Sequence, residues 1–237
     1  MEQKGGIAPF LLYNKDEGLR FRKEFSIGGG AMEKLPDLFQ NREPQLISEF
    51  PWKNHAVLFP FVETDQGLSL LFEVRSSHLR TQPGEISFPG GALEPGESAR
   101  EAAIRETAEE LLIRQNQIEV WGPGDIFAGP GARRIDSFVG KIQNYRNTYS
   151  REEVAEVFKI PFSELLQLKP QVTHNAIRLE LDPDFPVHEI PNGKNYQWRM
   201  SEYRILFYRW KRYLIWGITA RFLESLCEAI RQNGFKF

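Results

Sequence analysis

Residues 90–112 have the sequence GGALEPGESAREAAIRETAEELL, and they determine most of what the chain's sequence indicates. Ser98 followed by Glu101 has the form of a capping box, so the spacing predicts a helix over residues 98–113. The glycine pair that opens the stretch favours a tight unit of strand, loop and helix, which a merely solvated helix would not need.

The predicted helix has an acidic side. Three glutamates related by i, i+3 and i+4 lie within a third of its circumference: Glu106, Glu109 and Glu110. Apolar residues lie roughly opposite and are expected to pack inward: Ile104, Ala108 and Leu111. Small residues share the acidic side and leave it open to a loop or a ligand: Ala99, Ala102 and Ala103. Like charges at these spacings repel one another, and a divalent cation would remove that repulsion.

Carboxylates without histidine or cysteine suit Mg²⁺ or Mn²⁺, and Mg²⁺ is usually bound through one or two carboxylates together with substrate phosphates. The pattern therefore indicates phosphate chemistry. A solvated acidic face with a good cap is the alternative that the charge count alone favours. The glycine-rich entry to the helix favours the metal site.

The composition excludes several classes of protein. The chain has 237 residues, 41% of them hydrophobic, and a net charge of −2, so we expect no general affinity for nucleic acid or for anionic membranes. Its single cysteine, Cys227, excludes an internal disulfide, and a buried structural role is expected for it rather than a nucleophilic one. No signal peptide or membrane-spanning segment is recognisable, which predicts a soluble cytoplasmic protein.

The rest of the chain predicts a mixed α+β sandwich, with helices packed on a curved, mostly antiparallel sheet. One domain over residues 1–237 is expected, with residues 1–50 as an N-terminal elaboration of open role that includes a short helix near 31–40. Apolar runs predict strands at 55–63, 67–75, 85–88, 118–122, 136–142, 154–160, 176–182, 203–209 and 213–217. Further helices are expected at 161–166 and from Thr219 to Gly234.

The glutamate segment also resembles a known family signature. Gly91, five residues, Glu97, seven residues, Arg105-Glu106, two residues and Glu109-Glu110 is similar to the signature of the Nudix hydrolases. Two positions depart from that pattern, since Thr107 replaces an aliphatic residue and Leu112 replaces a glycine. The resemblance implies a Nudix-like α/β/α sandwich with a mixed sheet and a catalytic unit of strand, loop and helix.

The resemblance also implies roles for individual residues. Glu106 and Glu110 would be the principal metal ligands, assisted by Glu109 and Glu97. Arg105 would orient these carboxylates, and the general base would be Glu109 or a residue of a later loop such as Glu153. Bound Mg²⁺ or Mn²⁺ would neutralise a diphosphate and activate a water.

A narrower resemblance lies upstream, to Nudix enzymes that act on coenzyme A. The matching residues are Arg75-Ser76, Leu79-Arg80, Gly84 and Phe88-Pro89-Gly90-Gly91, with further similarity extending over residues 50–230. It implies substrate contacts from Arg75, Arg80, Gly90 and Gly91. The aromatic residues of 195–217 are expected either to cover an adenine or acyl-pantetheine group or, more commonly, to pack in the core or in a homodimer interface.

The expected reaction is hydrolysis of coenzyme A or acyl-coenzyme A to 3′,5′-ADP and the corresponding 4′-phosphopantetheine. Two alternatives stay open at this point. One is a Nudix pyrophosphohydrolase for another nucleoside diphosphate derivative, and the other is a non-catalytic nucleotide sensor. The presence of all four glutamates argues against the sensor.

Overall fold

The computed structural model describes residues 53–129, 133–198 and 201–233. All of them belong to the unit Ser48–Phe237. The helix expected near residues 31–40 and the N-terminal elaboration over residues 1–50 lie outside the described residues, so the prediction about domain organisation stays a prediction.

The described elements follow the chain as a run of strands interrupted by a few helices. Their bounds are β1 Lys53–Thr64, β2 Gly67–Arg75, β3 Ile86–Ser87, β4 Gly90–Ala92, α2 Ala99–Glu110, η1 Gln115–Gln117, β5 Ile118–Gly129, β6 Arg133–Ile142, β7 Val154–Pro161, α3 Phe162–Leu165, β8 Gln171–Ile177, η2 Gly193–Asn195, β9 Ser201–Trp210, β10 Tyr213–Trp216 and α4 Gly217–Gln232. Within this part of the chain no helix combines the length and the apolar character that a membrane span requires.

The larger sheet has the strand order β3-β2-β1-β6-β5, with β4 added to β1 and β7 added to β2. Strands β1 and β6 run parallel, whereas the other pairs in this sheet are antiparallel. The expected mixed, mostly antiparallel sheet is therefore confirmed.

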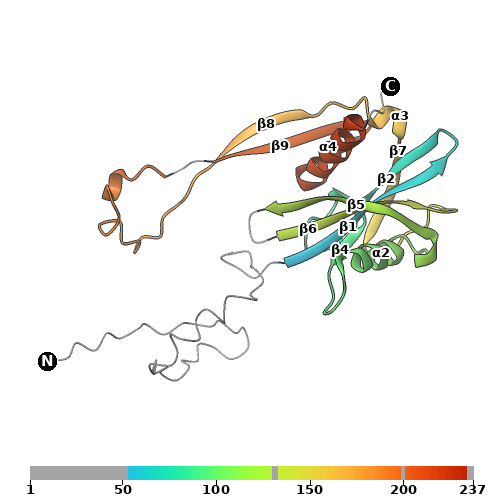
Figure 1. The fold of residues 1–237 in the computed structure, drawn as a ribbon, viewed down its shortest axis with the longest axis horizontal. Helices are drawn as coiled ribbons and strands as arrows, with labels where there is room; N and C mark the ends of the chain where they lie inside the picture. The colour runs from blue at the N-terminus through green and yellow to red at the C-terminus, as the bar shows by residue number, and fades with distance from the viewer. Residues whose placement is uncertain (1–52, 130–132, 199–200, 234–237) are drawn as a thin grey trace, which may run out of the picture. The chain divides into compact units, whose positions relative to one another are not determined.

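Helices α2 and α4 cover opposite faces of this sheet (Figure 1). Because side chains alternate along a strand, β1 supplies both faces. Phe59 and Phe61 pack in the larger core with α4, where the rings of Phe59 and Phe222 are 5.5 Å apart. Ala56 packs instead against Ala102 and Ala103 of α2. This arrangement confirms the expected α+β sandwich.

The packing of α2 corrects one expectation. Ala102 and Ala103 do not leave an open surface for a loop or a ligand, because both are fully buried against β1. Small side chains let the helix approach the strand closely, and this brings the acidic side of the helix against the sheet. The inward packing expected of Ala108 and Leu111 is confirmed, and both are buried.

A second sheet has the order β10-β9-β8 and is antiparallel throughout its described strands. Here the strand expected at 176–182 is wrong, since β8 spans Gln171–Ile177. Among the described residues, pairing with β9 ends at Ile177, opposite Ser201, and residues 178–182 form no strand. The alternating pattern around Leu179, which is 60% exposed, therefore produces no strand.

Other observed strand and helix boundaries differ from the predicted ones by a few residues. Strand β5 continues past the expected end at 122, because irregular pairing with β6 around Pro123 carries it on to Gly129. Helix α4 begins at Gly217 rather than at Thr219, whose hydroxyl bonds the carbonyl of Ile86 instead of capping the helix. The expected end of this helix at Gly234 lies outside the described residues.

Some of the described aromatic residues of 195–217 pack in the core, whereas Tyr196, Trp198 and Trp216 are exposed. Tyr208 and Trp210 are buried, and Trp210 stacks on Phe158.

Cys227 is also buried, and burial raises the pKa of its thiol to about 11, which leaves the thiol uncharged at neutral pH. The expectation that Cys227 is structural is confirmed.

Candidate functional site

The helix that carries the glutamates is firmly capped. The Ser98 hydroxyl accepts a hydrogen bond from the Glu101 amide at 3.3 Å, and the Glu101 carboxylate accepts one from the Ser98 amide at 2.9 Å. This capping box satisfies two of the free amides at the helix start, as the sequence predicted. It fixes the point at which the chain turns from the loop after β4 into α2.

The two glycines of β4 allow backbone and helix to come together. A Cβ atom on Gly91 would lie 2.3 Å from Cδ of Glu106, and one on Gly90 would lie 2.2 Å from the carbonyl oxygen of Ala56. Gly90 also adopts φ 151°, which other residues rarely adopt. Glycine is therefore required at position 90 for β4 to pair closely with β1, and at position 91 for the Glu106 carboxylate to occupy its place above the strand.

Arg105 holds three of the carboxylates. Its Nε and Nη2 donate to the two oxygens of Glu97 at 2.9 and 3.0 Å, and Nη1 donates to Glu106 at 2.9 Å and to Glu109 at 3.4 Å. Nη2 also donates to the carbonyl of Ala92, which ties the guanidinium to the end of β4. Hydrogen bonding to Arg105 lowers the pKa of Glu97. The orienting role that the resemblance implied for Arg105 stays a prediction.

Glu110 is the glutamate that Arg105 does not reach. It is 3% exposed, and its Oε2 accepts a hydrogen bond of 2.8 Å from the Gly90 amide. Burial raises the pKa of Glu110 well above its usual value, and the nearby Glu73 raises it further. Burial also raises the pKa of Glu106, against the opposing effect of the hydrogen bond from Arg105. The site thus gathers negative charge that the described protein groups only partly neutralise.

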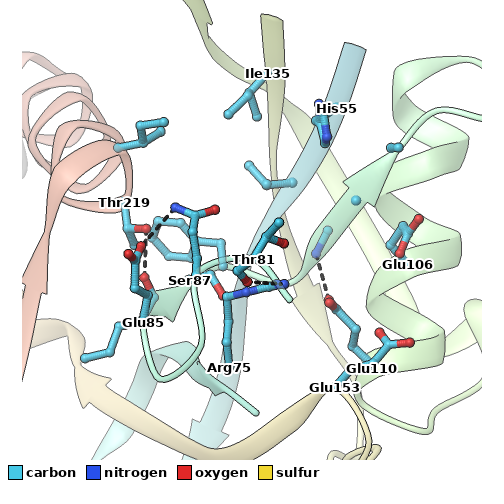
Figure 2. A pocket seen from close by; sticks show the side chains of 18 of the residues that line it. His55, Arg75, Thr81, Glu85, Ser87, Glu106, Glu110, Ile135, Glu153 and Thr219 are labelled. Atoms are coloured by element: carbon cyan, nitrogen blue, oxygen red, sulfur yellow. Dashed lines mark hydrogen bonds between the residues drawn. The ribbon is translucent and has the colours of Figure 1, made fainter. Parts of the chain in front are cut away.

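A cavity of about 580 Å³ opens beside these carboxylates (Figure 2). Its lining includes six of the residues predicted for the site: Arg75, Gly90, Gly91, Glu106, Glu110 and Glu153. The other four predicted residues are not part of that lining: Arg80, Glu97, Arg105 and Glu109. Arg105 donates hydrogen bonds to both Glu97 and Glu106, while Glu109 has a side chain that is 60% exposed.

Arg75 and Arg80 are separated by the fold. Arg75 ends β2, and its backbone amide and carbonyl bond Glu85 and Gly84 at 2.9 and 3.0 Å, which closes the intervening loop. Its side chain faces the cavity, and Nη2 makes one long hydrogen bond of 3.5 Å to the carbonyl of Thr81. Arg80 lies on the exposed part of this loop.

The residues of the site region that the sequence did not predict include Lys53, His55, Glu73 and Arg133. Glu73 is 1% exposed, and its Oε1 accepts a hydrogen bond of 2.8 Å from the hydroxyl of Ser87. Burial raises its pKa to about 7. The available signal was a lone glutamate inside the apolar run of β2, a position that fits either a buried site or an exposed strand edge. The other three residues line the cavity, and no sequence motif marks them.

The helix end accommodates the second departure from the signature, at Leu112, whereas at the first departure the hydroxyl of Thr107 is buried without a hydrogen-bond partner among the described residues. Thr107 is fully buried where an aliphatic residue is usual. Leu112 adopts the left-handed conformation with φ 50°, so the usual turn is retained without glycine. The Ile113 amide bonds the Ala108 carbonyl at 3.0 Å, as in a Schellman motif.

The donor set fits a hard divalent cation. Within the described residues, no lysine or arginine pairs with Glu110, although its carboxylate is buried and lies near Glu73, Glu106 and Glu153. A cation would stabilise the ionised form of these groups. No three acidic, histidine or cysteine side chains in the described ranges form a complete ion-binding set. Substrate oxygens and water would have to complete the coordination, as is usual for Mg²⁺.

Comparisons of this chain with protein-family models and with known proteins indicate one and the same family. Residues 52–181 match the NUDIX domain. The chain is 30% identical over 208 residues to the "Uncharacterized Nudix hydrolase NudL" of Yersinia enterocolitica, an alignment that covers 86% of this chain and 96% of that protein. It is 26% identical over 211 residues to "Nudix hydrolase 3" of Caenorhabditis elegans, covering 86% and 85% of the two chains.

Among solved structures, a MutT/nudix family protein from Enterococcus faecalis aligns with a TM-score of 0.46 and 16% identity, over 85% of this chain and 70% of that one. The signature on α2, the mixed sheet and the match over residues 52–181 agree. The chain belongs to the NUDIX family and is a Nudix hydrolase, an enzyme that cleaves phosphorus-containing anhydrides.

Proposed function

We propose that this Nudix hydrolase cleaves the diphosphate bond of coenzyme A or an acyl-coenzyme A, releasing 3′,5′-ADP and the corresponding 4′-phosphopantetheine. The observation that carries the proposal is the position of Arg75. This arginine is the first residue of the sequence pattern that resembles Nudix enzymes acting on coenzyme A. Its side chain lines the same cavity as Glu106 and Glu110. A guanidinium in the same cavity as a cluster of carboxylates suits a substrate whose phosphates contact both the arginine and a cation held by the carboxylates.

Nudix hydrolases generally use divalent metal ions, and we propose Mg²⁺ or Mn²⁺ here. Such an ion would neutralise the diphosphate and lower the pKa of a bound water. Glu106 and Glu110 would hold it, because both line the cavity, with Glu110 buried and Glu106 partly buried. Glu97 and Arg105 would act as positioning residues, since Arg105 joins Glu97 to Glu106 without lining the cavity.

For the general base, we propose Glu153 rather than Glu109. Glu153 lines the cavity with the two proposed ligands, whereas the carboxylate of Glu109 is mostly exposed and bonds Arg105. A base must lie within reach of the water whose proton it accepts. Glu153→Gln is expected to lower kcat by at least about 100-fold, and Glu109→Gln by less than about 10-fold. The opposite ranking in steady-state kinetics would assign the base to Glu109.

A product assay tests the substrate. The enzyme would be incubated with coenzyme A, acetyl-coenzyme A, NADH, ADP-ribose or a diadenosine polyphosphate, each with Mg²⁺ or Mn²⁺. Selective release of 3′,5′-ADP from the coenzyme A compounds is the expected result. Faster turnover of another compound would retain the glutamate site and reject coenzyme A as substrate.

A further inference from the structure

Two cations stand side by side at the rim of the cavity. Lys53 and Arg133 begin the parallel strands β1 and β6 and are partners in their register. Both line the cavity, together with His55 and Ile135, which are the next residues on the same face of each strand. Figure 2 shows His55 and Ile135 at one end of the cavity and Arg75 and Glu153 at the other.

Neither cation has an acidic partner within the described ranges of the chain. The neighbouring Arg134 differs, because both oxygens of Asp136 bond its guanidinium at 2.9 Å. Neighbouring strands are about 4.8 Å apart, so like charges at paired positions repel each other and lower stability. An anion placed between Lys53 and Arg133 would turn that repulsion into attraction.

The position of this pair relative to β4 fits one substrate that carries two separate anionic groups. Ala56 of β1 pairs with Gly91, directly beneath Glu106. Lys53 lies three residues earlier on β1, about 10 Å away along the strand. Long side chains at the rim can therefore reach a second anionic group of a substrate whose diphosphate lies at Glu106 and Glu110. The apolar side chain of Ile135 also lines the cavity.

We propose that Lys53 and Arg133, with His55, form a subsite for a phosphomonoester of the substrate. This inference rests on the proposed function, in which that group is the 3′-phosphate of coenzyme A. His55 contacts the backbone carbonyl of Lys53 through Nδ1 at 3.2 Å, which orients its ring beside the two cations. The subsite selects substrates that carry a phosphate on the ribose over those that carry only the diphosphate.

Paired substrates test the subsite. The ratio of kcat/KM for coenzyme A to that for 3′-dephospho-coenzyme A is expected to fall about tenfold in Lys53→Gln and in Arg133→Gln, and further in the double variant. Arg100→Gln is the matched charge control, because Arg100 is exposed on α2 and is not part of the cavity lining. Its ratio is expected to equal that of the wild type.

Calorimetry supplies a readout that does not depend on turnover. The double variant should lose at least about tenfold in affinity for 3′,5′-ADP relative to 5′-AMP. An equal loss for both nucleotides, or no loss for either, would overturn the subsite. If coenzyme A is not hydrolysed but this selective loss is found, the proposed reaction fails while the phosphomonoester subsite stands.

Discussion

Replacing Gly91 by alanine should disable the site while leaving the fold intact. The added Cβ would lie 2.3 Å from Cδ of Glu106 and 2.4 and 2.5 Å from its oxygens, whereas ordinary contacts begin at 3.4 Å. The carboxylate must therefore move by about 1 Å, which is a displacement that lowers rates by roughly 100-fold when it misplaces a reacting group. Because the obstructed atoms end a flexible side chain, the free energy of unfolding should fall by only about 1 kcal/mol or less.

Steady-state kinetics with coenzyme A and Mn²⁺, together with thermal unfolding, measure both effects. Gly122→Ala is the control, because a Cβ there meets nothing within 4 Å. It should retain wild-type kcat/KM. A Gly91→Ala enzyme with wild-type kcat/KM would refute the reasoning that Glu106 must occupy the space above this glycine.

Three further substitutions probe the buried charge and the helix end. Glu110→Gln should lower kcat by at least about 100-fold, because the amide cannot supply the negative charge that a divalent cation requires from this position. Glu73 has a pKa raised from 4.5 to about 7, so the folded state binds more protons than the unfolded state between these values. The free energy of unfolding should fall across that window by roughly 3 kcal/mol at most, and metal-free denaturant titrations should show this fall disappear in Glu73→Gln. Leu112→Gly should raise the free energy of unfolding by about 0.5 kcal/mol. A leucine in the left-handed conformation costs about 1–2 kcal/mol, and the larger conformational entropy of glycine in the unfolded chain offsets part of the gain. An unchanged denaturation midpoint would show that the left-handed conformation of Leu112 stores no strain.

Local patterns in the sequence predicted the central unit of the fold. The capping box at Ser98 depends on residues three apart, and the helix it begins was placed correctly from spacing alone. Arg105 contacts Glu97 and Glu106, and the orienting role expected of it from the signature stays a prediction. These features lie within one segment of about 20 residues, where sequence distance and spatial distance correspond closely.

Features that depend on strand register were not predictable in the same way. Lys53 and Arg133 are 80 positions apart, and only the parallel pairing of β1 with β6 makes them neighbours. The close packing of Ala102 on Ala56 likewise depends on which strand lies under α2. Periodicity indicates that a face is small or apolar, but it does not indicate what covers that face.

The burial of Glu73 illustrates a second limit. A single acidic residue in an apolar strand is consistent with an exposed edge or with a buried site. The structure places Glu73 next to Ser87 and near Glu110, which gives it a raised pKa and a place in the charge balance of the site. Such coupling arises between elements and has no local signature.

The most direct test of the account is chromatographic measurement of 3′,5′-ADP formed from coenzyme A with Mn²⁺, by the wild-type enzyme and by Glu110→Gln at equal concentrations of folded protein. The account predicts steady release of 3′,5′-ADP by the wild type and at least about 100-fold less by the variant. Equal release by both proteins would contradict the assignment of the chemistry to the buried glutamate. Release by neither would contradict coenzyme A as the substrate.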